Sequence, residues 1–421
     1  MKKILTLFII ILLSTLSFCQ EIKTEDWTTD LNFLKSELQK KHINLFFKLT
    51  KNEFEEGIEE IISKLDSDSD FETTMKLSQL LAKIGDSHTT INISKFLNIQ
   101  KNIPINCTWF GEDIHVVSTS KDNYEILDKK MVSINEYHIK TIIDSIKTIF
   151  SNDNNATIKK GTIRLINNKK LLDYFGFSKS SDSIYRIGFE NSKNQLSFEN
   201  VATERYDKKT RISTKIDGLR PYYIEGKGNI FKEKYYEKDK IYYIQYNKCI
   251  SKESVLATGN KLEATKYPSY KKFEQKILNT IETKKVKKLI FDMRFNTGGN
   301  SSIIKNLIRQ IRVNKSLNQK DKLFVVVGQR TYSSAILNTL AFKHFTNATV
   351  IGEETSGMPN HYGNIKSFYL PYSNIKLNYS TKYHNLYKGI DNTIKPDIEI
   401  IRTFDDYKKG IDPIYEFVKN Y

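Results

Sequence analysis

The sequence predicts a multi-domain protein of mixed α and β structure whose C-terminal half is an α/β core. From residue 240 onward, short apolar runs rich in β-branched residues alternate with helix-length amphipathic segments. This alternation is typical of a largely parallel sheet covered by helices. The chain has 421 residues, which is more than one ordinary domain, and we expect two or three domains.

The α/β core is predicted over residues 231–421. Its strands are Ile241–Tyr246, Leu289–Met293, Leu323–Val327 and Thr349–Ile351, and its helices are Phe273–Ile281, Ile303–Ile311 and Ala335–Phe342. We expect a β-hairpin from Phe368 to Tyr379 and a last helix from Asp405 to Val418 to complete it. Ligands bind at the carboxyl ends of the strands in such sheets, so the loops after these strands are the expected functional region.

Three amphipathic helices are predicted between Asp30 and Ile84 and define an N-terminal helical domain over residues 20–92. A plausible cap residue precedes each helix: Asp30, Asn52 and Asp70. Residues 93–150 alternate as short strands followed by a helix. The polar, tyrosine-containing stretch 151–230 is interpreted as a β-rich insert.

The first 19 residues have the pattern of a secretory signal peptide. Two lysines precede an apolar run, Ile4–Leu13, that is too short to span a bilayer, and small residues follow at Ser17 and Cys19. We expect cleavage after Cys19 and an exported protein, periplasmic or extracellular. The alternative is a lipid anchor on Cys19, against which the bulky Phe18 argues. No later segment reaches the length of a membrane span.

The remaining composition restricts the partners and cofactors. Cys107 and Cys249 are compatible with one disulfide or with two buried thiols. The histidines show no metal-binding spacing, so we expect no metal and no other cofactor. The formal charge of +17 comes from dispersed lysines without a nucleic-acid-binding motif, and we therefore expect no nucleic-acid partner.

Two hydroxyl side chains, Ser333 and Ser334, stand where the predicted strand Leu323–Val327 turns into a helix. Backbone N–H groups at a helix N-terminus can stabilise the oxyanion of an acyl-transfer transition state, so a serine in this place suits a nucleophile. The alternative is that the serines only cap the helix, which is the commoner role for this segment taken alone.

Two further turns carry candidate residues. Gly298 and Gly299 follow the strand Leu289–Met293, and glycines there let the backbone approach a ligand, although a plain tight turn is the alternative. Ser87 and His88 follow a helix that ends near Gly85, which places the imidazole on a loop where it can face a cleft.

Five segments together resemble the C-terminal processing, or tail-specific, serine peptidase family. They are Leu-Ile-Phe-Asp-Met-Arg-Phe-Asn-Thr-Gly-Gly-Asn at 289–300, Thr-Tyr-Ser-Ser-Ala at 331–335, Gly-Glu-Glu-Thr-Ser-Gly at 352–357, Lys-Pro-Asp-Ile-Glu-Ile at 395–400 and Gly-Asp-Ser-His-Thr at 85–89. The last of these resembles the branch that includes the tricorn protease core. The resemblance implies a crotonase- and ClpP-like ββα core over 231–421. It also implies a PDZ-like module at 93–150, diverged here because the glycines of the carboxylate-binding loop are missing.

The resemblance also implies a mechanism. Met358 stands where one branch of the family has a general-base lysine, and a thioether cannot accept the serine proton. The tricorn-like branch takes its base from an upstream Ser-His pair, which Ser87 and His88 match. The implied roles are Ser333 as nucleophile, His88 as general base, Ser87 and Asp391 as orienting groups, and the backbone amides of Gly298 or Gly299 and of Ser334 as the oxyanion hole. Asp391 stands where relatives more often have glutamate.

The sequence thus predicts an exported serine peptidase that hydrolyses peptides or unfolded proteins through an acyl-enzyme. His361 is a competing general base because it lies close to the position of the missing lysine. Two other functions stay open: an inactive peptide- or lipid-binding member of the same fold, which Met358 favours, and an acyl hydrolase or esterase. The natural substrate and the oligomeric state do not follow from the sequence.

Overall fold

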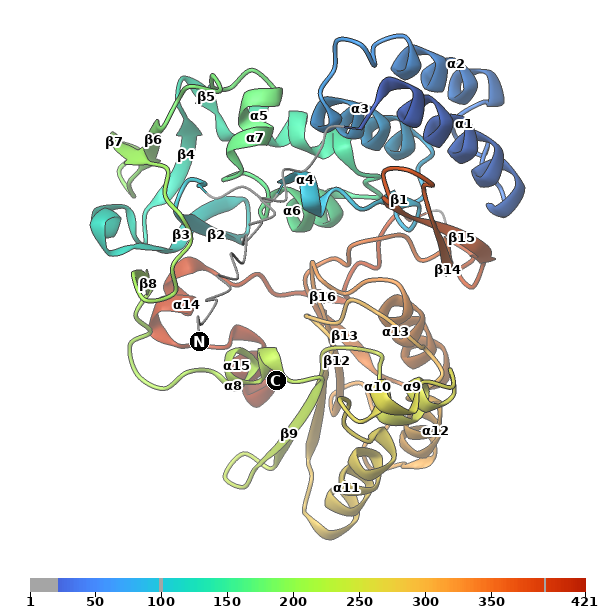
Figure 1. Cartoon of the computed structure of the whole chain (residues 1–421). Coiled ribbons are helices and arrows are strands. Elements are labelled where there is room, and N and C mark those ends of the chain that lie inside the picture. Colours follow the sequence, from blue (N-terminus) through green and yellow to red (C-terminus); the bar gives the residue numbers. More distant parts are fainter. Residues whose placement is uncertain (1–21, 98–100, 390) are drawn as a thin grey trace, which may run out of the picture.

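The computed structural model describes residues 22–97, 101–389 and 391–421 and contains three regions, each with its own sheet (Figure 1). The expected signal peptide and Cys19 lie outside the described residues. Within the described part of the chain, no helix combines the length and the apolar character that a membrane crossing requires.

The N-terminal region confirms the three predicted helices: α1 (Thr24–Lys41), α2 (Lys51–Ile62) and α3 (Asp70–Lys83). Thr50 and Ser69 cap α2 and α3 through capping boxes, in place of the predicted Asn52 and Asp70. Asp30 is also no helix cap. It lies buried inside α1, where its carboxylate accepts hydrogen bonds from the backbone N–H groups of Tyr372 and Ser373.

The hairpin that Asp30 holds consists of β14 (His361–Tyr369) and β15 (Lys376–His384). The prediction that this hairpin completes the α/β core is wrong. It pairs instead with β1 (Thr90–Ile91) in a three-stranded sheet. The reason is hydrophobic: Leu377 and Tyr379 pack into the same core as the three N-terminal helices, and Figure 1 shows the hairpin beside them. Since β1 begins two residues after His88, the hairpin also fixes the loop that carries this histidine.

The middle region is a seven-stranded sheet with helices. Its strands are β2 (Ile105–Phe110), β3 (Asp113–Ser120), β4 (Lys130–Ile134), β5 (Tyr137–His138), β6 (Ile184–Glu190), β7 (Leu196–Ala202) and β8 (Arg211–Ser213), and its main order is β2-β3-β4-β6-β7. The helices here are α4 (Ser94–Leu97), α5 (Ile139–Ile146), α6 (Asn155–Thr162) and α7 (Lys169–Tyr174), with 3₁₀ turns η1 (Lys121–Ile126) and η2 (Lys147–Ile149). A hollow of about 870 Å³ lies on this region and is lined in part by β4 and α5.

The predicted boundary at residue 150 cuts through this sheet, because β4 pairs with β6. Residues 151–230 are therefore not a separate β-rich insert. They begin with α6 and α7, whose first turns are capped by the side chains of Asn154 and Asn168. The polar composition that suggested an insert reflects these caps and exposed strand faces.

The C-terminal region has a six-stranded sheet with the order β16-β13-β12-β11-β10-β9. The strands are β9 (Phe231–Tyr236), β10 (Ile241–Tyr246), β11 (Lys288–Asp292), β12 (Leu323–Val327), β13 (Thr349–Gly352) and β16 (Ile398–Glu399). All pairs are parallel except β9 with β10. The four predicted strands are confirmed, and the two unpredicted ones lie at the edges.

Helices cover both faces of this sheet, as expected of an α/β core. The helices of the C-terminal region are α8 (Tyr222–Glu225), α9 (Lys252–Leu256), α10 (Lys261–Ala264), α11 (Tyr270–Thr283), α12 (Lys305–Val313), α13 (Ser334–Phe345), α14 (Phe404–Lys409) and α15 (Pro413–Asn420), with the 3₁₀ turn η3 (Gly226–Gly228). Helices α11, α12 and α13 share one apolar cluster with the sheet, and α15 shares the other. The predicted last helix is two helices, because Gly410 has a left-handed φ of 72° and Pro413 starts the next one.

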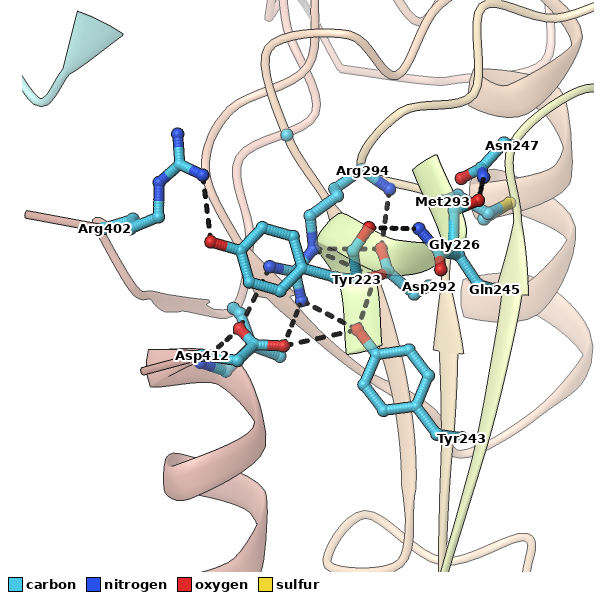
Figure 2. Close-up of polar contacts among 12 residues, drawn as sticks. Tyr223, Gly226, Tyr243, Gln245, Asn247, Asp292, Met293, Arg294, Arg402 and Asp412 are labelled. Atoms are coloured by element: carbon cyan, nitrogen blue, oxygen red, sulfur yellow. Dashed lines mark hydrogen bonds and ion pairs between the residues drawn. The ribbon is translucent and has the colours of Figure 1, made fainter. Parts of the chain in front are cut away.

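A buried ionic network ties α15 to the loop after β11 (Figure 2). Arg294 makes a bidentate pair with Asp412, at 3.0 and 3.1 Å, and also contacts Asp292. Tyr243 donates a hydrogen bond to Asp292. Burial raises the pKa of Asp292, and the Arg294 charge opposes that rise. Because removing one partner of such a pair costs about 3–5 kcal/mol, the network holds the start of the glycine turn at 298–299 rigidly.

Candidate active site

Ser333 lies at the turn between β12 and α13 with a strained backbone conformation, φ 55° and ψ −124°. A residue other than glycine rarely adopts a positive φ, and such strain concentrates at functional sites. The Ser333 side chain makes no helix-capping hydrogen bond, so the capping interpretation is wrong for this residue. Ser334 is no cap either, since its Oγ donates to the carbonyl of Gly299 at 2.6 Å.

Neighbouring hydrogen bonds hold this turn in place. Thr331 Oγ1 accepts from the Gly328 N–H at 3.0 Å and donates to the Met293 carbonyl at 2.9 Å. The Tyr332 N–H donates to the Asn296 carbonyl at 3.0 Å. The turn of the nucleophile candidate is thus pinned to the loop that follows the adjacent strand β11.

His88 meets Ser333 although 244 residues separate them in the chain. Its Nε2 lies 3.0 Å from Ser333 Oγ, which is hydrogen-bonding distance. The loop after α3 delivers the ring: Gly85 has a positive φ of 79°, and the Asp86 carboxylate accepts from the His88 backbone N–H at 2.9 Å. The expected proximity of the two side chains is therefore observed.

The electrostatics keep His88 neutral at ordinary pH. Burial lowers the pKa of His88 to about 4, although the Asp86 charge pulls it upward. Burial alone would raise the pKa of Asp86, but hydrogen bonds, chiefly from His42, outweigh it and lower that pKa to about 2. Asp86 Oδ1 lies 3.9 Å from His88 Nδ1, which is too long for a hydrogen bond. Asp86 thus acts on the imidazole through its charge.

The hydrogen-bond partner of His88 Nδ1 is Tyr332, the residue before the nucleophile candidate. Tyr332 Oη lies 3.1 Å from Nδ1 and 2.7 Å from Ser87 Oγ. Ser87 Oγ in turn donates to Asp153 Oδ2 at 2.7 Å. Burial raises the pKa of Asp153 to about 6, with the nearby Asp86 charge adding to the rise and the Ser87 hydrogen bond opposing it.

Asp391 does not join this network, in contrast to its predicted place there. Its side chain is exposed, and its Oδ2 accepts a hydrogen bond from Tyr387 at 2.6 Å. The acidic position is occupied by Asp153, just before α6. Sequence reasoning missed Asp153 because nothing in its local pattern distinguishes it from a polar residue in a loop before a helix cap.

Hydrogen bonding distinguishes which of the candidate backbone N–H groups are available to bind an oxyanion. The Gly298 N–H donates to Asn296 Oδ1 at 2.9 Å and is therefore occupied. Among the described residues, no hydrogen bond engages the Gly299 N–H. Both glycines have positive φ, and a Cβ on Gly298 would come within 2.8 Å of Ser333 Cβ. The backbone N–H groups of Gly299 and Ser334 thus remain as candidate oxyanion donors. Gly298, which has no Cβ, lets the glycine turn lie close to Ser333.

The competing base, His361, also lies in the site. Its ring stacks on that of His88, with centroids 5.6 Å apart and planes 15° apart, and the His384 ring lies tilted against it at 5.2 Å. His361 Nδ1 is 2.9 Å from the Met358 carbonyl, an acceptor, so Nδ1 carries the proton. The structure shows no hydrogen bond between His361 and Ser333, while His88 makes one.

Lys160 is a second residue that sequence reasoning missed. Its Nζ lies 3.9 Å from the centre of the Tyr332 ring and donates to Ser356 Oγ at 2.9 Å. Burial lowers the pKa of Lys160 to about 8, although the Asp153 charge opposes this. Lys160 and Asp153 both belong to the segment around α6, so the middle region contributes directly to the site.

Cys107 and Cys249 are free thiols, which settles the two open alternatives against a disulfide. Cys249 is buried beneath the glycine turn, 3.4 Å from Asn296 Oδ1. Within the described residues, no group of three or more His, Cys, Asp or Glu side chains is placed to hold a metal ion.

A strained serine at a strand-to-helix turn, a neutral imidazole on its hydroxyl and free backbone N–H groups beside it define a serine hydrolase. Residues 240–400 match the profile of peptidase family S41. The C-terminal region is therefore similar to that family, and the protein is a serine-type peptidase.

Solved structures agree with this fold. Mature CPAF superposes with a TM-score of 0.63 at 12% identity, covering 94% of this chain and 96% of that one. Mature CPAF complexed with lactacystin gives 0.61 at 11% identity, covering 94% and 97%. The photosystem II D1 C-terminal processing protease gives only 0.41 at 11% identity, covering 94% and 96%, which is too low for a conclusion. No curated protein matches the chain.

Proposed function

We propose that this protein hydrolyses peptide bonds in peptides or unfolded proteins through an acyl-enzyme on Ser333, with His88 as general base. The single observation that carries the proposal is the 3.0 Å contact between His88 Nε2 and Ser333 Oγ. Nucleophilic catalysis by serine needs a base within hydrogen-bonding reach, and a neutral imidazole satisfies this need.

The reaction follows from the geometry. His88 Nε2 takes the Ser333 proton as Oγ attacks the carbonyl carbon, and the imidazolium then protonates the leaving amine. The N–H groups of Gly299 and Ser334 hold the oxyanion, a contact worth about 3 kcal/mol per donor. Water, deprotonated by His88, hydrolyses the acyl-enzyme. The missing lysine at Met358 costs nothing in this scheme because His88 supplies the base.

The test compares two neighbouring serines on an unstructured fluorogenic peptide. Ser333→Ala should abolish cleavage while the melting temperature stays near that of wild type, because only the nucleophilic atom is lost. Ser334→Ala keeps its N–H but frees the Gly299 carbonyl, and we expect roughly a tenfold loss, equal to about 1.4 kcal/mol.

Full activity of Ser333→Ala would refute the assignment. Loss in Ser334→Ala alone would shift the nucleophile by one residue. A wild-type protein that neither cleaves peptides nor reacts with a serine-directed reagent would favour the binding module suggested by Met358. Cleavage of esters only would favour an acyl hydrolase.

We also propose that the protein is exported and that its mature form begins at Gln20. The support is the charged, apolar and small-residue pattern of residues 1–19. Intact-mass measurement of protein from its native host decides the point. A mass that includes a lipid on Cys19 would replace the proposal by a membrane-anchored enzyme.

A further inference from the structure

A continuous chain of hydrogen bonds leads from the reacting hydroxyl to one carboxylate. It runs from Ser333 to His88, then to Tyr332, Ser87 and Asp153, through contacts of 3.0, 3.1, 2.7 and 2.7 Å. Each hydroxyl in the chain has one proton to donate, so the donors must all point the same way. The carboxylate at the end therefore decides the direction.

We propose that Tyr332, Ser87 and Asp153 form a positioning relay that selects the active tautomer of His88. This inference rests on the proposed function of Ser333 and His88 and adds three residues to it. An ionised Asp153 only accepts, so Ser87 donates to it, Tyr332 donates to Ser87, and Tyr332 Oη must accept from His88 Nδ1–H. Nε2 is then left without a proton and can take the one from Ser333.

A protonated Asp153 can donate as well as accept, so it no longer fixes this direction. The opposite polarity then becomes available: Asp153 donates to Ser87, Ser87 to Tyr332, and Tyr332 to His88 Nδ1. The imidazole proton must then lie on Nε2, which faces Ser333. A protonated Nε2 cannot accept the serine proton. No proton travels along the relay during catalysis, since Nδ1 keeps its hydrogen in the productive state. The relay orients His88 and does not conduct protons.

The charges around the relay favour two separate titrations. Burial raises the pKa of Asp153 to about 6 and lowers that of His88 to about 4, so Asp153 gains its proton first as the pH falls. Burial also raises the pKa of Tyr332, so the phenol always has one proton to donate. The charged or titratable groups that face Asp153 are Asp86, Lys48 and Lys160, and those that face His88 are Asp86, His361, His384 and Lys160.

Lys160 supports the relay of Tyr332, Ser87 and Asp153. Its ammonium lies over the face of Tyr332, on which the His88 ring also stacks with centroids 4.7 Å apart. The Lys160 charge pulls the pKa of Asp153 down, against the effect of burial. The lysine therefore helps to keep the carboxylate ionised, and with it the active tautomer, at neutral pH.

The experiment measures kcat/KM against pH for wild type and three variants on the same fluorogenic peptide. Wild type should lose activity below about pH 6 as Asp153 is protonated. Asp153→Asn should fall on the order of 100-fold or more at all pH values, because its amide can donate to Ser87 and impose the inactive tautomer. Tyr332→Phe keeps the ring but cuts the chain, so we expect roughly a 10- to 100-fold loss and no acid limb near pH 6. Asp391→Asn should stay within about threefold of wild type, since within the described residues the hydrogen-bond partner of its carboxylate is Tyr387.

Nitrogen-15 NMR of labelled histidine supplies a readout that does not depend on turnover. At pH 7, His88 should carry its proton on Nδ1 in wild type and on Nε2 in Asp153→Asn. The relay would be overturned if His88 of wild type carried its proton on Nε2. It would also be overturned if Asp153→Asn and Tyr332→Phe both kept the wild-type kcat/KM and its acid limb. An equal loss in Asp391→Asn would restore Asp391 as the acidic residue. Active Ser333→Ala would refute the proposed function separately, while the tautomer would still test the relay.

Discussion

Ser333 and the glycines opposite it come from one sheet, whereas His88 and its partners come from three regions of the chain. The nucleophile turn follows β12, and the glycine turn follows the neighbouring strand β11. On the other side, Ser87, His88 and the hairpin residue His361 come from the N-terminal region, Asp153 from the middle region and Tyr332 from the C-terminal region. The nucleophile half of the site, which consists of Ser333 and the glycine turn, is thus fixed by local strand pairing. The base half, which consists of His88 and its partners, is fixed by packing between regions.

This difference has a functional consequence. The oxyanion donors and the strained serine stay in register as long as the C-terminal sheet is folded. The base half is correct only while three regions are docked together. Substitutions at the docking surfaces should therefore weaken the base without changing the nucleophile turn.

The largest effect is expected at the base itself. His88→Ala should lower kcat by about 10²–10⁴-fold, the range that general-base catalysis contributes. The site keeps its oxyanion donors, so some hydrolysis above background should remain. Measurement of kcat for the unstructured peptide at pH 8 tests this. Retention of half the wild-type rate would mean that another group, with His361 first, acts as the base.

The next effect probes the nucleophile half. A Cβ on Gly299 would lie 2.2 Å from the Cys249 carbonyl oxygen, so Gly299→Ala must displace the backbone N–H proposed for the oxyanion. We expect kcat to fall about 10²–10³-fold, the loss for one oxyanion donor. The KM should change little. A variant with a normal kcat would show that the Gly299 N–H is not part of the oxyanion hole.

A smaller effect is expected at the joint between the middle region and the core. The buried Asn154 amide donates to the carbonyls of Thr355, Gly357 and Asn392 at 3.0, 3.3 and 2.8 Å. Asn154→Ala leaves these acceptors unpaired, which should lower the free energy of unfolding by about 1–3 kcal/mol.

Because Asp153 is the next residue, the same Asn154→Ala change should also lower kcat roughly tenfold, or about 1.4 kcal/mol. Denaturant unfolding and kcat are measured on one sample. Asn168→Ala, at the cap of α7, is the matched control. It should lose stability without the loss in kcat, and equal losses in both variants would contradict the link through Asp153.

The smallest effect is expected at His361, which stacks on the base but does not contact the nucleophile. His361→Gln should lower kcat about two- to fivefold through the loss of stacking, worth about 0.5–1 kcal/mol. A steady-state assay at pH 8 is sufficient. A loss as large as that of His88→Ala would assign the general-base role to His361.

The sequence predicts the nucleophile half well for a physical reason. The strands Leu323–Val327 and Ile241–Tyr246 are continuous apolar runs, which buried parallel strands require, and their bounds agree with the structure. Ser333 lies in the turn after Leu323–Val327, and Gly298 and Gly299 lie in the turn after the neighbouring predicted strand Leu289–Met293, so strand pairing alone brings them together. Local pattern and tertiary structure therefore coincide in this half.

The base half shows what a pattern cannot supply. The sequence predicts a β-hairpin from Phe368 to Tyr379 but not the sheet it joins, which is decided by the apolar face of the N-terminal helices. Asp391 lies near a motif in sequence but faces outward toward Tyr387, while Asp153, far away in sequence, reaches Ser87. The local pattern places His88 on a loop that can face a cleft, but only the resemblance to a family motif gives it the role of general base.

The most direct measurement of the central claim is the site of covalent labelling by a serine-reactive fluorophosphonate. We expect one adduct, on the peptide that contains Ser333, in folded wild-type protein at pH 8. Labelling should be lost in Ser333→Ala and slowed strongly in His88→Ala, because an un-ionised serine without its base is a weak nucleophile. An adduct on Ser334 or Ser356, or labelling of Ser333 that proceeds equally fast without His88, would contradict the account.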